Sequence, residues 1–165
     1  TEKYNFGDAE TVLLTGCSAG GLATYLHTDY VASQLPASGA LLPQTNPPAA
    51  APTALPSAPG LHNRVVPADL SSVTKYGASP ISGFFLLHNN TENAPVYPTQ
   101  MKHIFEIANS TNGLNAACIA DKAPEDQWMC NFAQEAYNYT KSPIFPLNSA
   151  LDSWQTVCIY AADLP

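Results

Sequence analysis

The stretch GCSAGG, residues 16–21, contains the pattern G-x-S-x-G between an apolar run and an amphipathic segment. This pattern is typical of a nucleophilic serine on a sharp strand-to-helix turn, where small residues two positions away let the two elements approach closely. The turn also directs the next backbone N–H, that of Ala19, toward the oxyanion formed during acyl transfer. We therefore predict a nucleophile at Ser18, with a plain glycine-rich turn as the alternative. The remaining residues of the predicted elbow are Gly16, Cys17, Gly20 and Gly21.

A serine nucleophile needs a base, and the base needs a carboxylate that orients it. Asp152 follows the apolar run PIFPL, residues 143–147, at the expected carboxyl end of a strand. We predict that Asp152 is this carboxylate. The alternative role is an N-cap for the following helix, since aspartate favours that position. Cys17 is a less favoured nucleophile, because we expect it to point into the packing of the turn.

The histidine that completes such a triad follows the acid in α/β hydrolases. All four histidines of the chain precede Asp152: His27, His62, His88 and His103. We expect His27 to be packed in its helix. We expect His62 and His103 to be solvated, and His88 to end a strand near the site in the wrong chain order. The base is therefore expected beyond Pro165, in a part of the protein outside this chain.

The segments around these residues alternate between strand and helix patterns. Apolar and β-branched runs predict buried strands. The predicted strands lie at 11–16, at 82–89 and, as a short strand, within 142–147. The first of them is expected to be parallel to its neighbours. Apolar residues at three- and four-residue spacing predict helices; these run from 19 to about 33, over 97–113 and, as a helix or irregular segment, over 125–139. Alternating strands and helices predict an α/β fold with a mostly parallel sheet flanked by helices.

Residues 36–60 are dominated by proline and alanine and contain no charged or aromatic residue. Such a segment buries too little apolar surface to offset its ordering entropy. We interpret it as a flexible surface insertion in a single domain that spans 1–165. The chain starts without methionine, and we expect the domain to be incomplete at both ends.

The composition argues against several classes of partner. The net charge is −7 and there are only six lysine and arginine residues, so no nucleic-acid partner is expected. No run approaches the roughly 18 apolar residues of a membrane span, so no membrane insertion is expected. No pair of cysteines has the C-x-x-C spacing of a zinc site, and we expect no metal and no cofactor. The oligomeric state is left undetermined.

Four cysteines and three glycosylation sequons indicate the compartment. Cys118 and Cys130 flank one short loop and are close enough in sequence to be bridged. The sequons N-x-[ST] begin at Asn89, Asn109 and Asn138. Together they favour a secreted protein.

Four blocks of the chain resemble the pectin acetylesterase family, which includes the Notum-type carboxylesterases. They are VLLTGCSAGGLATYLHTDYV at 12–31, SGFFL at 82–86, ACIADKAPEDQWMCNF at 117–132 and SPIFPLNSALDSWQ at 142–155. The resemblance implies an α/β-hydrolase-like fold and a secreted serine esterase. By position it implies Ser18 as nucleophile, Ala19 as oxyanion-hole residue, Asp152 as triad acid and a disulfide between Cys118 and Cys130.

The resemblance also implies a substrate class. Since GCSAGG and NSALDSWQ are more similar to the plant-type branch, the expected substrate is an O-acetylated cell-wall polysaccharide. Removal of a lipid acyl group, as in the Notum branch, is one alternative. Pro80-Ile81-Ser82 replaces a usual acidic residue, and Thr28 stands where the family often has cysteine. The missing histidine and the altered residues near Ile81 motivate a second alternative, a non-catalytic binding protein that retains the hydrolase scaffold, although the intact elbow and Asp152 argue against it.

Overall fold

The computed structural model describes residues 9–35, 73 and 75–163. Its sheet is formed by β1 (Thr11–Cys17) and β2 (Lys75–Ile81), which pair in parallel along their whole length. Two parallel bridges, Ala78 with Ile144 and Ile81 with Leu147, add a third segment on the other side of β2. The predicted parallel arrangement is thus confirmed. The predicted insertion at 36–60 lies outside the described residues.

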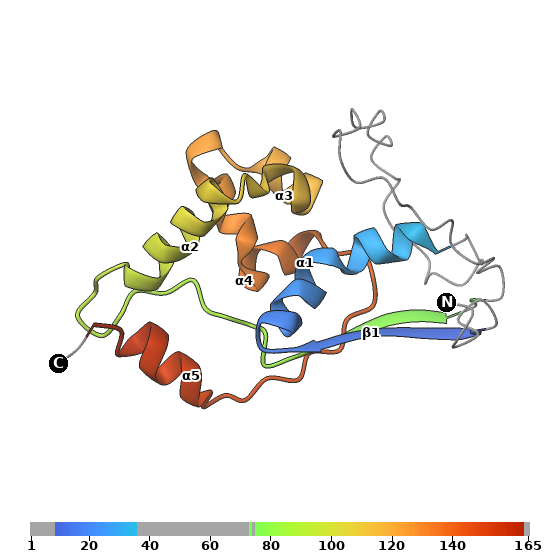
Figure 1. The fold of residues 1–165 in the computed structure, drawn as a ribbon, viewed down its shortest axis with the longest axis horizontal. Coiled ribbons are helices and arrows are strands. Elements are labelled where there is room, and N and C mark those ends of the chain that lie inside the picture. The colour runs from blue at the N-terminus through green and yellow to red at the C-terminus, as the bar shows by residue number, and fades with distance from the viewer. Residues whose placement is uncertain (1–8, 36–72, 74, 164–165) are drawn as a thin grey trace.

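Helix α1 (Ala19–Gln34) packs against both strands, and in Figure 1 it lies directly above β1. Its start at Ala19 and its end near Ser33 are as predicted. The Thr28 side chain is 1% exposed, and its hydroxyl lies 3.0 Å from the hydroxyl of Tyr76 on β2. The Tyr76 hydroxyl also donates to the Thr28 carbonyl, at 2.9 Å. Thr28 therefore forms a buried polar contact between helix and sheet.

Strand β1 is covered on one face only, so the prediction of a fully buried strand was wrong. Its burial alternates along the strand, and Leu13 is 62% exposed. In Figure 1, helices α1 to α4 all lie on one side of the strands. Three further exposed apolar side chains belong to β2 and the third segment: Ile81, Phe145 and Leu147. We call these three and Leu13 the bare face.

The second strand was predicted in the wrong place. The strand is Lys75–Ile81, whereas residues 83–90 are irregular and Ser82 turns the chain with φ of 48°. Pro80 disguises the strand, because proline lacks the N–H that a sheet needs. In a regular ladder, an N–H at position 80 would donate to the carbonyl of Phe145. Here the Ser79 hydroxyl donates to the Phe145 carbonyl instead, at 3.1 Å. Neighbouring ladder bonds run from the Leu147 N–H to the Pro80 carbonyl and from the Ser82 N–H to the Leu147 carbonyl.

The remaining elements form a helical layer beside the sheet. They are α2 (Val96–Ile107), η3 (Ser110–Gly113), α3 (Ala116–Asp121), η4 (Pro124–Asn131), α4 (Ala133–Ala136), η5 (Tyr137–Tyr139), α5 (Ser153–Gln155) and η6 (Thr156–Tyr160). Both the predicted helix within 97–113 and the mixed region at 125–139 are confirmed. The core joins this layer to the segment after β2 through Phe85, Tyr97, Met101, Phe132 and Ile159. Burial raises the pKa of Tyr97 to about 12, with a smaller contribution from Cys158.

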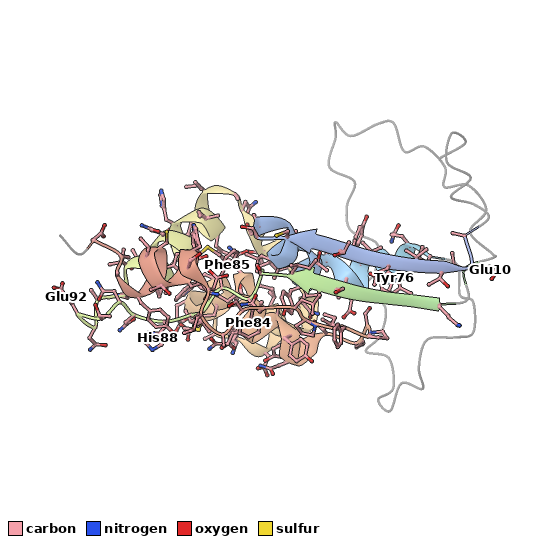
Figure 2. The ribbon with its side chains drawn as sticks, turned by 90° about the horizontal axis from the view of Figure 1, so that it is seen from below. Glu10, Tyr76, Phe84, Phe85, His88 and Glu92 are labelled. Carbon is pink, nitrogen blue, oxygen red and sulfur yellow. A yellow bond between two sulfur atoms is a disulfide. The ribbon has the colours of Figure 1, made fainter. Side chains whose placement is uncertain are left out.

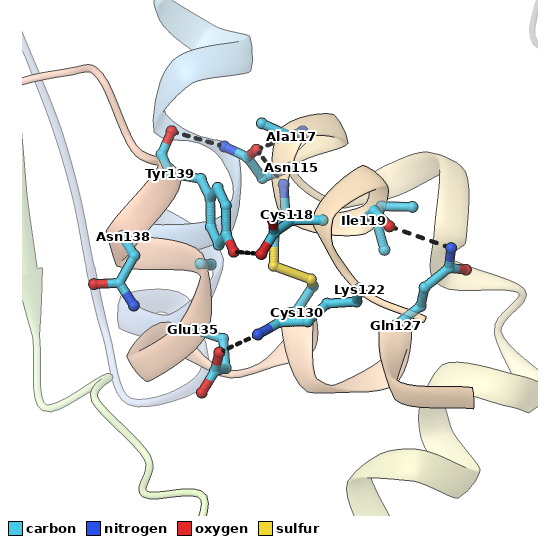
Figure 3. Close-up of a disulfide and its surroundings, with 12 residues drawn as sticks. Asn115, Ala117, Cys118, Ile119, Lys122, Gln127, Cys130, Glu135, Asn138 and Tyr139 are labelled. Atoms are coloured by element: carbon cyan, nitrogen blue, oxygen red, sulfur yellow. Dashed lines mark hydrogen bonds and ion pairs between the residues drawn. A yellow bond between two sulfur atoms is a disulfide. The ribbon is translucent and has the colours of Figure 1, made fainter. Parts of the chain in front are cut away.

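The disulfide expected between Cys118 and Cys130 is present, with 5.9 Å between the Cα atoms, and both residues are fully buried (Figure 3). Around it, Lys122 forms an ion pair of 2.8 Å with Glu135. The Tyr139 hydroxyl donates to the Asp121 carboxylate. These bonds hold α3, α4 and η5 around the bridge. Within the described residues, no helix is long and apolar enough to cross a bilayer.

The Asp29 carboxylate ties α1 to the third segment of the sheet. It accepts hydrogen bonds from the backbone N–H groups of Lys141, at 3.0 Å, and Ser142, at 2.8 Å. We expect Asp29→Ala to lower the free energy of unfolding by about 2 kcal/mol, because hydrogen bonds to charged groups are stronger than neutral ones. Chemical denaturation of the full-length protein measures this. Asp126→Ala, at a carboxylate with no hydrogen bond in the described residues, is the matched control and should change stability little.

The bare face predicts association of the 165-residue chain. Exposed apolar side chains on a sheet favour contacts between copies. We expect Leu13→Lys combined with Phe145→Lys to reduce light scattering by the purified 165-residue chain. Ile107→Lys, at an exposed apolar residue of α2 away from the sheet, is the control. Equal light scattering by the unaltered chain and by all variants would contradict a role of the bare face in association.

Candidate active site

Ser18 occupies a one-residue turn between β1 and α1. Its backbone has φ of 57° and ψ of −122°, a combination that non-glycine residues adopt only when the surrounding structure imposes it. The Ser18 N–H donates to the carbonyl of Ile81, at 2.9 Å, and its carbonyl accepts from the N–H of Leu22, at 3.0 Å. The side chain is exposed. The predicted strand, turn and helix around the serine are therefore all present.

Three glycines allow the backbone contacts that hold this turn. A Cβ on Gly16 would lie 2.3 Å from the carbonyl oxygen of Gly20, and one on Gly21 would lie 2.4 Å from that of Ile81. A Cβ on Gly83, after β2, would lie 2.2 Å from the carbonyl carbon of Gly21. At Gly20 a Cβ would meet nothing within 4 Å, so the expected need for a small residue there was wrong. Sequence reasoning missed Gly83, because its contact with α1 joins residues that are far apart in the chain.

The residues on either side of Ser18 belong to different elements. Ala19 is the first residue of α1, so its N–H has no carbonyl partner inside the helix and forms part of the positive end of the helix dipole. Cys17 is the last residue of β1, and its thiol is free and exposed. The expectation that Cys17 points into the packing of the turn was therefore wrong, because the bare face of the sheet leaves it uncovered.

Asp152 is the N-cap of the helical segment α5, so the role given above as the alternative is present in the structure. Its Oδ1 accepts the backbone N–H of Gln155 at 2.9 Å, while Oδ2 accepts no hydrogen bond from the described residues. The side chain is half-buried and lines a hollow of about 390 Å³ together with Phe84, Leu86 and Tyr160. The cap therefore fixes one oxygen and leaves the other open to a further donor.

Two side-chain amides, on either side of Asp152, tie its loop to the segment that leaves β2. Asn148 Oδ1 accepts the N–H of Phe84, and Gln155 Oε1 accepts the N–H of Leu86, both at 3.2 Å. Figure 2 shows this segment running from β2 past Phe84 and His88 toward Glu92. Sequence reasoning missed both amides, since the pairs they join are more than 60 residues apart.

The carboxyl ends of the three sheet segments lie side by side. The Ser18 N–H reaches Ile81 of β2, and the Ser82 N–H reaches Leu147 of the third segment. Ser18 follows β1 and Asp152 follows the third segment, so β2 lies between the two elements that carry them. No hydrogen bond joins Ser18 to Asp152 in the described residues.

None of the described histidines contacts either residue through a hydrogen bond. His27 is exposed on α1, which corrects the expectation that it is packed, because it lies on the helix face away from the sheet. His103 is exposed on α2, as expected. His88 is exposed, its Nδ1 lies 2.6 Å from the Asn89 carbonyl and its ring lies 5.2 Å from that of Tyr160. His62 lies outside the described residues, which contain no cluster of three metal-binding side chains.

A parallel sheet flanked by helices, with a strained serine between strand and helix, defines an α/β-hydrolase-like fold. The family model for pectinacetylesterase matches residues 2–42 and 59–164. The chain belongs to the pectinacetylesterase family.

Individual relatives agree with this membership. The chain is 25% identical over 153 residues to pectin acetylesterase 5 of Arabidopsis thaliana, covering 93% of the chain and 27% of that protein. It is 24% identical to pectin acetylesterase 4 of the same plant, covering 89% of the chain and 27% of that protein. The crystal structure of the Drosophila Wnt deacylase Notum superimposes with a TM-score of 0.59 at 18% identity, covering 90% of the chain and 35% of Notum. The chain thus spans about a quarter of the length of these plant relatives.

The two adjacent glycines of α1 give a matched test of the turn. We expect Gly21→Ala to destabilise the protein by about 1–3 kcal/mol, because its Cβ collides with backbone that cannot move aside. We expect Gly20→Ala to be neutral or to stabilise by up to about 1 kcal/mol, because alanine is the better helix former. Thermal unfolding of both full-length variants measures the difference. Equal melting temperatures would contradict the close contact of α1 with β2.

Proposed function

We propose that this chain carries the nucleophile and the acid of a serine carboxylesterase. The single observation behind the proposal is the strained Ser18 at a strand-to-helix turn in a member of the pectinacetylesterase family. Its hydroxyl is exposed at the carboxyl ends of the strands, where an ester can reach it. The close backbone contacts at the neighbouring glycines maintain the backbone strain at Ser18. Backbone strain of this kind is common at functional sites.

In the proposed reaction, Ser18 Oγ attacks the ester carbonyl while a histidine outside this chain takes its proton. Asp152 orients that histidine through Oδ2, the oxygen that the helix cap leaves open. The Ala19 N–H, at the start of α1, stabilises the tetrahedral oxyanion. The alcohol leaves, and water then releases the acyl group from Ser18. Asn148 and Gln155 support the orienting role of Asp152 by holding its loop against the segment after β2.

The proposed substrate is an O-acetylated cell-wall polysaccharide. The plant relatives are named as pectin acetylesterases, and their similarity extends over about nine-tenths of this chain. The net charge of −7 disfavours a bare polyanion and favours a pectin whose carboxylates are esterified. The buried disulfide is consistent with a secreted protein, which such a substrate requires.

Replacing the proposed nucleophile tests the reaction. We expect Ser18→Ala in the full-length protein to lower kcat for an acetyl ester by a factor of about 10⁴ or more. Cys17→Ala, one residue earlier on β1, is the matched control and should keep most activity. Unchanged melting temperatures show that both variants fold. Loss of activity in Cys17→Ala alone would assign the nucleophile to the cysteine instead.

The substrate class is tested by acetate release from acetylated pectin and acetylated xylan, with a long-chain acyl ester as the third substrate. We expect pectin to react with the highest kcat/KM. Activity on the long-chain ester alone would point to a lipid-deacylating enzyme. Full-length protein that binds the polysaccharide but cleaves none of the three esters would instead establish the non-catalytic alternative.

A further inference from the structure

The three sequons differ in how many amide hydrogens the fold already uses. N-glycosylation replaces one of the two hydrogens on the asparagine Nδ2 with a sugar. An amide that donates both hydrogens loses a hydrogen bond when it is modified, whereas an amide with a spare hydrogen does not. The described structure shows both situations among Asn89, Asn109 and Asn138.

Asn89 donates twice from its side-chain amide. Its Nδ2 lies 3.2 Å from the carbonyl oxygen of Asn93 and 3.0 Å from the Oδ1 of the same residue. The Asn89 carbonyl also accepts from His88. Both hydrogen bonds of this amide thus lie within the turn that the chain makes before α2, and a sugar on Nδ2 would disturb the turn.

The rest of the Asn89 sequon is equally bound to the fold. Asn90 is 6% exposed, and its Oδ1 accepts the N–H groups of Glu92 and Ala94. Its Nδ2 donates to the carbonyl of Ala162. The Thr91 N–H donates to the Tyr160 carbonyl at 2.7 Å. Opening the turn at Asn89 would therefore also disturb the contact between this loop and residues 160–162.

Asn109 has both hydrogens free. It lies in the left-handed conformation, with φ of 48°, at the junction between α2 and η3, and it is exposed. Its backbone N–H donates to Glu106, but its side-chain amide makes no hydrogen bond within the described residues. A sugar on Asn109 would extend into solvent without displacing any contact.

Asn138 uses a single hydrogen. Its Nδ2 donates once, to the carbonyl of Gln134 at 3.2 Å, and the residue is exposed on η5. Figure 3 shows its side chain pointing away from the disulfide. The hydroxyl of the neighbouring Tyr139 donates to the Asp121 carboxylate. The second hydrogen is therefore available on the outer side of this helical layer.

We propose that Asn109 and Asn138 are N-glycosylation sites and that Asn89 is an unmodified sequon. The co-reactant is a lipid-diphosphate-linked oligosaccharide. A bond forms between the asparagine Nδ2 and the sugar C1, the bond from C1 to the diphosphate oxygen breaks, and the Nδ2 proton leaves with the lipid diphosphate. A chain modified at Asn89 fails to close the turn and is not secreted in the folded form. This assignment is independent of the esterase proposal, because mapping of glycans measures no ester cleavage.

The test is site-specific mass spectrometry of the unaltered full-length protein, secreted from yeast or insect cells. Peptide N-glycosidase treatment in ¹⁸O water converts each glycosylated asparagine to labelled aspartate. We expect label at Asn109 and Asn138 and an unlabelled Asn89. Label at Asn89 in the folded protein, or an unlabelled Asn109 or Asn138, would overturn the assignment.

Variants provide a second readout. Asn109→Gln and Asn138→Gln should each increase the electrophoretic mobility by one glycan, and the matched Asn89→Gln should leave it unchanged. The mapping on the unaltered protein decides the question even where one of these variants does not fold. A mobility shift in Asn89→Gln would count against the proposal.

Discussion

The backbone contact between the start of α1 and the end of β2 is the constraint on which the site depends. Gly21 and Gly83 approach so closely that neither position has room for a Cβ, and the Ser18 N–H is bonded to the Ile81 carbonyl beside them. The chain can only turn from β1 into α1 within one residue if that residue takes an unfavourable backbone conformation. The strain at Ser18 is thus the consequence of packing a helix directly onto the neighbouring strand.

The same edge of the sheet positions the loop that carries Asp152. The third segment pairs with β2 through a ladder of hydrogen bonds. In this ladder the Ser79 hydroxyl replaces the N–H that Pro80 lacks. This ladder sets where the chain leaves the sheet at Leu147, and the Asn148 and Gln155 amides then fix the loop that carries Asp152. Ser18 and the loop of Asp152 are therefore both positioned by hydrogen bonds to the backbone of β2 and of the segment that follows it.

The helical layer is stabilised by different means. The Cys118–Cys130 disulfide, the Lys122–Glu135 ion pair and the aromatic core around Phe132 hold its short helices together. This layer presents Asn109 and Asn138 to solvent, whereas α1 covers one face of the sheet and the other face exposes the apolar side chains of the bare face. The candidate site lies at the carboxyl ends of the strands, where the sheet meets this layer.

By itself the sequence determined the features that depend on neighbouring residues. The G-x-S-x-G turn, the extent of α1 and the cap at Asp152 are local, because each arises from residues within a few positions of one another. Only the tertiary structure decided the place of β2, which Pro80 conceals until the third segment supplies a partner. It also decided the exposure of Leu13 and Cys17, the contact of Gly83 with α1 and the tethers from Asn148 and Gln155. These join residues that are far apart in the chain, and a linear pattern carries no signal for such distances.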